Sequence, residues 1–115
     1  MTDDSLNVTE GGDAIMVLIT ASSREEADRI ARQLVDERLA ACVTIVPQVW
    51  SLFIWEQTVS QEDEVLLLVK SRRARFAQVV AAVTRLHSYA VPEIMALPIV
   101  MGSSAYLRWL SESTP

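Results

Sequence analysis

The spacing of apolar and polar positions changes several times along this 115-residue chain, and each change predicts a new structural element. Residues 15–19 form a continuous apolar run, which is typical of a strand buried on both faces, so we place it centrally in a sheet. Residues 24–38 then carry apolar side chains at helical spacing. Ser22 and Ser23 each precede a glutamate by three residues, so either can cap this helix. The predicted apolar stripe comprises Ala27, Ile30, Ala31, Leu34 and Val35.

The middle of the chain predicts a long β-hairpin. Residues 41–55 are rich in β-branched and aromatic side chains, and residues 59–70 form a second β run after a short separating segment. At about 3.3 Å per residue, a strand of some fifteen residues would extend about 50 Å, more than the width of a compact domain of this size. Either Pro47 bends the first strand or part of the hairpin projects outward. The polar residues 61–64 are interpreted as solvated.

The last third predicts a second helix, an edge strand and a short third helix. Ser71 is expected to cap the second helix, which ends near His87. Residues 94–101 are a strand that Pro98 confines to a sheet edge, and residues 102–104 begin the C-terminal helix. The element order is that of an α+β, ferredoxin-like βαββαβ fold with an extra helix: a two-layer sandwich with an antiparallel sheet of order 4-1-3-2 and both long helices on one face.

Composition and charge narrow the class of protein. Residues 1–13 have four acidic side chains and no periodic apolar positions, so we expect a mobile acidic tail before a domain spanning residues 14–113. The net charge of −5 disfavours nucleic acid and anionic membranes as partners. No apolar run approaches the ~20 residues of a membrane span, and the N-terminus lacks signal-peptide features, which predicts a cytoplasmic protein. Apolar types make up 50% of residues, which predicts contact with another subunit.

Candidate chemistry gathers in residues 87–93, which hold the only histidine, Tyr89 and Glu93. His87 can bond a carbonyl at the helix C-terminus, bind a metal or contact a small molecule. A metal would need at least two more ligands, and no CxxC or HExxH spacing supplies them. Glu93 can equally be an exposed carboxylate at a strand end. Cys42 lies in an apolar stretch, so we expect a buried structural thiol rather than a nucleophile paired with His87.

No catalytic set follows from the other candidates. Lys70 ends an apolar strand and can pair with a carboxylate or stay solvated, and the aromatic cluster of residues 50–55 favours subunit packing over base stacking. Acylphosphatases share the element order, but residues 20–24 lack the glycines of their anion loop. An RNA-binding sheet needs paired aromatics that residues 65–69 do not have. We therefore expect a protein without enzymatic activity.

Several short motifs together resemble the CutA divalent-cation tolerance family, over residues 14–113. They are Leu39-Ala40-Ala41-Cys42-Val43, Ile45-Val46-Pro47, Trp55-Glu56, His87-Ser88-Tyr89-Ala90-Val91-Pro92-Glu93-Ile94, Leu97-Pro98-Ile99 and Tyr106-Leu107-Arg108-Trp109-Leu110. The resemblance implies a ferredoxin-like homotrimer, joined through long β-hairpins, that takes part in the response to divalent metal ions. A protein of this family is expected to require no cofactor, and the metal that the resemblance implies is Cu²⁺ or another divalent cation. An alternative implied by the same family is a regulatory module, similar to the PII proteins, that binds a small metabolite or a protein partner at clefts between subunits.

The resemblance also assigns a ligand cleft. By match to the family motifs, its residues are His87, Tyr89, Pro92 and Glu93, with Trp55, Glu56 and Lys70 as weaker companions; a metal would be held by His87 and Glu93. Three departures weaken the copper interpretation. Ala90 stands where the family often has a glutamate, Ile19 where some members have a cysteine, and Leu86 where some relatives have a second histidine. The hairpin turn also lacks the family's Gly-Lys pair.

Overall fold

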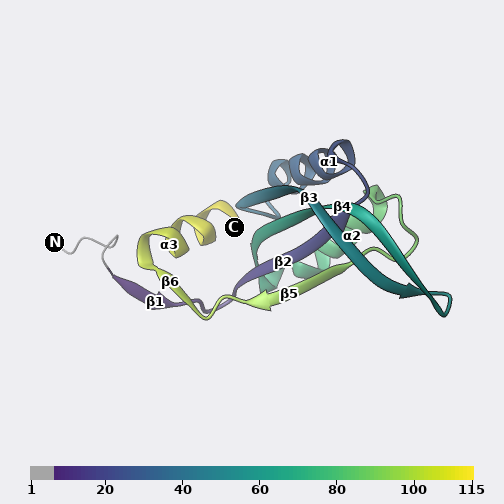
Figure 1. Ribbon diagram of the computed structural model, residues 1–115. Helices are drawn as coiled ribbons and strands as arrows, with labels where there is room; N and C mark the ends of the chain where they lie inside the picture. Colours follow the sequence, from purple (N-terminus) through teal and green to yellow (C-terminus); the bar gives the residue numbers. More distant parts are fainter. Residues whose placement is uncertain (1–6) are drawn as a thin grey trace.

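The computed structural model describes residues 7–115 as a sandwich of sheet and helices with a projecting hairpin (Figure 1). Its elements in chain order are β1 (Val8–Glu10), β2 (Ala14–Ala21), α1 (Arg24–Asp36), β3 (Cys42–Trp55), β4 (Thr58–Arg72), a 3₁₀ turn η2 (Arg73–Arg75), α2 (Phe76–Leu86), β5 (Ile94–Pro98), β6 (Met101–Ser103) and α3 (Ser104–Ser113).

The main sheet confirms the predicted ferredoxin-like topology. Its antiparallel strands lie in the order β3-β4-β2-β5, which is the expected 4-1-3-2 order read from the other edge. The apolar run at residues 15–19 lies in the interior strand β2, and β5, which ends at Pro98, lies at an edge. A proline is compatible with this position because an edge strand leaves one row of backbone groups unpaired.

Both long helices cover one face of this sheet. The side chains that point toward them alternate along β2 and β4 and form a single core with the apolar faces of α1 and α2. The fully buried members include Val17, Ile30, Leu67 and Val83. Burying each such aliphatic side chain stabilises the fold by roughly 1.5–3 kcal/mol. Val35 does not join this core, because the packed arc of α1 ends at Leu34 and leaves Val35 41% exposed.

Two predicted helix caps have different outcomes. Ser23 caps α1, since its hydroxyl accepts a hydrogen bond from the backbone N–H of Glu26. The prediction that Ser71 caps the second helix is wrong. Ser71 is still part of β4, where its buried hydroxyl donates to the carbonyl of Leu39 at 2.6 Å. The η2 turn intervenes, and α2 begins without a side-chain cap.

The hairpin β3–β4 extends beyond the helices at one end of the molecule, whose longest dimension is 57 Å (Figure 1). Its register shifts between Val46 and Val49, where β3 holds one more residue than β4, so Pro47 lies in a bulge. The turn at its tip is formed by Glu56 and Gln57, both with positive φ angles of 50° and 68°. A two-residue turn with this handedness matches the twist of the paired strands.

A second, small sheet lies at the opposite end of the molecule. Residues 8–10, which the sequence placed in an irregular tail, form β1 and pair with β6, a partner about ninety positions away that no local pattern reveals. Residues 1–6 lie outside the described residues, so the mobility of the tail stays a prediction. Gly11 links β1 to β2 and passes so close to Ile99 that a Cβ there would clash with its carbonyl oxygen.

Candidate functional site

A cavity lies where the hairpin meets the segment after α2. It has a volume of about 700 Å³, within the usual range of small-molecule sites. Its lining residues are Thr20, Trp50, Ser51, Leu52, Phe53, Trp55, Ser60, Glu62, Glu64, Tyr89, Ala90, Val91 and Glu93. Three carboxylates and four aromatic rings therefore share one cavity, and no lysine or arginine lines it.

Glu64 is the innermost of the three carboxylates. Its residue is only 7% exposed, and the hydroxyl of Tyr89 donates to its Oε2 at 2.9 Å. Burial of Tyr89, reinforced by this bond to Glu64, raises the pKa of the phenol, so it remains a protonated donor. The prediction of a solvated polar segment is wrong at Glu64, which is buried where Tyr89 bonds it. Glu62, on the same face but nearer the hairpin tip, and Asp63 are exposed.

Glu93 lies on the rim of the same cavity. Partial burial raises the pKa of its carboxyl group, and the nearby charge of Glu64 raises it further. Two acidic groups that repel each other across a cavity create a negative potential there. The cavity is thus suited to attract a positively charged group.

His87 lies behind the cavity rather than in it. Its side chain is fully buried, and its Nε2 lies 2.7 Å from the carbonyl oxygen of Thr20, while its Nδ1 accepts the backbone N–H of Tyr89 at 3.0 Å. These two bonds require the neutral tautomer with its proton on Nε2. Both ring nitrogens are therefore engaged, and the role this geometry gives His87 is to hold Tyr89 in place.

Glu26 is a site-supporting residue that the sequence reasoning read only as a capping partner. Burial raises the pKa of its carboxyl group, but hydrogen bonds from Ser22 and Ser88 outweigh that effect and lower the pKa to about 2. The carboxylate accepts from the N–H and hydroxyl of Ser22, both at 2.9 Å, and from the N–H of Ser88 at 2.8 Å. It therefore fastens the start of α1 to the segment that carries Tyr89 and Glu93. A glutamate at the third helical position was the one signal available in the sequence.

The structure brings together only part of the predicted cleft within one chain. Trp55, Tyr89 and Glu93 line the cavity, whereas the exposed Glu56 lies in the hairpin turn. Lys70 lies at the far end of β4, where its Nζ donates to the hydroxyl of Thr44 and lies 3.7 Å from Cys42 Sγ. The thiol of Cys42 is only partly buried, which differs from the expected fully buried thiol because its strand lies at the sheet edge.

A complete metal site is not formed within the described part of one chain. Residues 7–115 contain no group of three or more histidine, cysteine, aspartate or glutamate side chains placed to hold an ion. With both nitrogens of His87 engaged, binding through His87 and Glu93 would require the ring to give up a hydrogen bond.

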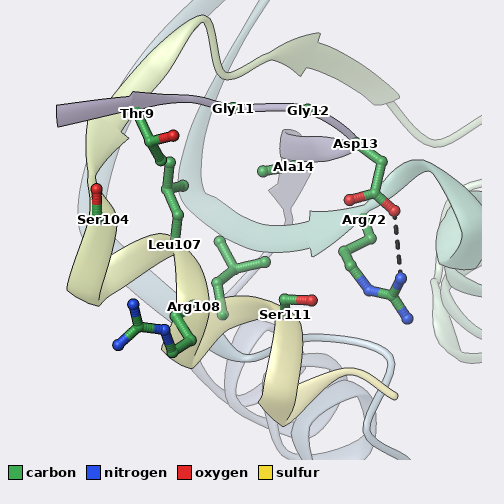
Figure 2. A pocket seen from close by; sticks show the side chains of 11 residues that line it. Thr9, Gly11, Gly12, Asp13, Ala14, Arg72, Ser104, Leu107, Arg108 and Ser111 are labelled. Carbon is green, nitrogen blue, oxygen red and sulfur yellow. Dashed lines mark hydrogen bonds and ion pairs between the residues drawn. The ribbon is translucent and has the colours of Figure 1, made fainter. Parts of the chain in front are cut away.

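A smaller cavity of about 440 Å³ lies between α3, β1 and the end of β4 (Figure 2). Its Arg72 side chain bonds Asp13 at 3.2 Å, and its Nε donates to the carbonyl oxygen of Thr114 at 2.8 Å. The guanidinium group thus joins the chain's C-terminal residues to the β1–β2 link. The polar groups of this cavity therefore have a structural role.

The fold and the cavity define a class: a small ferredoxin-like α+β protein with an extended hairpin and an acidic, aromatic cavity at its base. Residues 15–113 match the family model described as "CutA1 divalent ion tolerance protein". The chain belongs to this family.

Individual relatives are similar to this chain over most of its length. The divalent-cation tolerance protein CutA of Thermus thermophilus is 50% identical, with 86% of this chain and 96% of that protein covered. Its solved structure superposes with a TM-score of 0.87 at 49% identity, covering 89% of this chain and 99% of that one. The structure of CutA from Synechococcus elongatus gives a TM-score of 0.92 at 29% identity, covering 98% and 100%.

The relatives do not share one cellular location. The solved CutA from Archaeoglobus fulgidus, with a TM-score of 0.86 and 40% identity over 89% of this chain and 99% of that one, is described as periplasmic. The CutA of Arabidopsis thaliana, 43% identical over 88% of this chain and 56% of its own length, is described as chloroplastic. Within residues 7–115, no helix is long and apolar enough to cross a membrane. A cytoplasmic location stays a prediction.

Proposed function

We propose that this protein is a non-enzymatic homotrimer that takes part in tolerance of divalent cations. Family membership supports the link to divalent cations, and the exposed apolar hairpin supports self-association. Trp50, Leu52, Ile54 and Val59 are 61–75% exposed in the single chain. A projecting strand pair with this much uncovered apolar surface is a strong indication of a subunit interface.

Light scattering tests the assembly. We expect a mass three times the 12.8 kDa of the chain at micromolar concentration. Ile54→Lys, which places a charge at the projecting tip, should shift the protein to smaller species because burying an unpaired ammonium group opposes association. Val35→Lys is the matched control, since Val35 is also exposed but lies on α1. A monomeric parent protein contradicts the proposal.

Titration calorimetry tests the metal role. Copper is added to metal-stripped protein, alongside Glu93→Gln and a control variant, Glu25→Gln, on the exposed face of α1. A metal role predicts saturable binding that Glu93→Gln weakens while the assembly persists. His87→Ala is the less informative variant, because it also removes the two hydrogen bonds that hold Tyr89 and Thr20. Absence of saturable binding to the assembled protein contradicts a direct metal role.

A second candidate function is a module similar to the PII proteins, which binds a small molecule. The cavity of about 700 Å³ favours it, because its size and its mixture of aromatic and polar groups are those of a ligand site. Binding of this kind survives addition of a chelator. Thermal-shift measurements with and without chelator therefore separate the two candidates, since a bound ligand stabilises the folded protein by mass action.

A further inference from the structure

We propose that the cavity between the hairpin and residues 89–93 binds a small organic cation, an amine with an aromatic or aliphatic body. This inference rests on the second candidate function and gives the chemical class of its ligand. Three features of the cavity support it: the sign of its charge, the buried position of one carboxylate and the aromatic character of its walls.

The charge of the cavity lacks a counterpart of opposite sign among its lining residues. Glu62, Glu64 and Glu93 contribute carboxylates and no lysine or arginine lines the space. Glu64 is 7% exposed, and its one contact in the cavity is a neutral donor, the hydroxyl of Tyr89. An ammonium group bound beside Glu64 would supply the cationic partner that the lining residues lack.

The walls select an organic cation over a bare metal ion. Trp50, Phe53 and Trp55 line the hairpin side of the cavity, and aromatic faces attract ammonium and alkylammonium groups. A divalent ion instead needs several oxygen ligands that converge at one point. The described residues of the chain form no such convergent group.

The site is also held in shape before any ligand arrives. Tyr89 is bonded to Glu64 through its hydroxyl and to His87 through its backbone N–H, with the two rings 4.7 Å apart. Ser88, the preceding residue, is bonded to the buried Glu26. A preorganised acceptor loses less conformational entropy on binding, which favours affinity for a small ligand.

The test uses phenethylamine as the probe, 2-phenylethanol as its neutral isostere and benzoate as an anion of similar size. Binding to the assembled protein is followed by NMR through the indole N–H signals, because Trp50 and Trp55 line the cavity whereas Trp109 lies on α3. We expect saturable shifts of the Trp50 and Trp55 signals and none of the Trp109 signal. The alcohol should bind at least about tenfold more weakly than the amine, as expected for loss of one charged contact. Glu64→Gln should weaken amine binding about tenfold, and Glu25→Gln should leave it unchanged.

Each other outcome overturns the inference. Equal affinity for amine and alcohol, or preference for benzoate, would retain a small-molecule function but reject the amine class. No saturation with any of the three probes would count against the small-molecule function itself. If Glu64→Gln does not fold, Glu93→Gln at the exposed rim replaces it, and unchanged amine binding in that variant rejects the charge argument.

Discussion

The two ends of the β3–β4 hairpin show opposite relations to the rest of the chain. Near the helices, Leu67 and Val69 are fully buried by α1, α2 and β2. Toward the tip, Ile54 and Trp50 are 75% and 66% exposed although they are equally apolar. One continuous pair of strands is thus buried by its own chain at one end and left exposed at the other, where the proposed trimer would cover it. Hydrophobicity alone therefore does not identify the core of a single subunit.

The largest expected effect separates the two ends directly. Leu67→Ala should lower the free energy of unfolding by about 2–5 kcal/mol, because it leaves a cavity in the core. Leu52→Ala, at a position 61% exposed in the single chain, is the matched substitution at the tip. Urea unfolding at high and low protein concentration measures both.

The Leu67→Ala loss should be nearly independent of concentration, whereas the Leu52→Ala loss should shrink on dilution, when subunits separate. Equal losses at every concentration would mean that the tip is buried within its own subunit. The comparison between the two ends would then fail.

A second prediction concerns the hydrogen bonds by which Glu26 joins the start of α1 to the loop beside the cavity. Glu26→Gln should cost about 2 kcal/mol near pH 7, since its carboxylate accepts three charge-assisted bonds. A carboxyl group whose pKa falls on folding contributes stability that is complete above its unfolded pKa and is lost as pH falls through its folded pKa. For Glu26 the loss runs from about pH 4.5 down to about 2.

Unfolding curves across that pH range provide the measurement. The parent protein should lose stability on acidification more steeply than Glu26→Gln, so the difference between them should disappear near pH 2. Glu25→Gln, one position away and exposed, is the control. Parallel curves for the parent and Glu26→Gln would show that the carboxylate charge does not contribute to the stability of this contact.

The smallest expected effect lies at the tip itself. Gln57 has a φ of 68°, a conformation that costs side-chain-bearing residues energy but not glycine. Gln57→Gly should stabilise the turn by about 0.5–1 kcal/mol, whereas Thr58→Gly, in the first residue of β4, should destabilise it. Thermal unfolding of both variants measures the difference. A loss of stability in Gln57→Gly would contradict the turn argument.

The sequence predicted the elements well because their signals are local. The apolar run of β2, the helical spacing of α1 and the interruption at Pro47 each depend on neighbouring residues, and the structure confirms all three. The sheet order followed from known rules of topology. The pairing of β1 with β6 joins distant segments and left no local trace.

The site was less predictable, because its geometry depends on contacts between distant residues. Resemblance to a family pointed to Tyr89 and Glu93, which do line the cavity. It could not show that His87 would bond a carbonyl 67 positions away, or that Glu64 would turn inward from a polar stretch. Burial of a polar residue is a property of the assembled fold, and sequence spacing gives only its periodicity.

The extra residue in the bulge of β3 determines which side chains border the cavity. Beyond the bulge, Phe53 and Trp55 pair with β4 positions on the face that carries Glu62 and Glu64. Because successive residues of a strand point to opposite faces, removing one residue there would exchange the two sets. Ile54 would then take the face that carries Glu62 and Glu64, and Phe53 and Trp55 would turn to the opposite face. A single extra residue in β3 thus sets which side chains of the hairpin tip share a face with the carboxylates of β4.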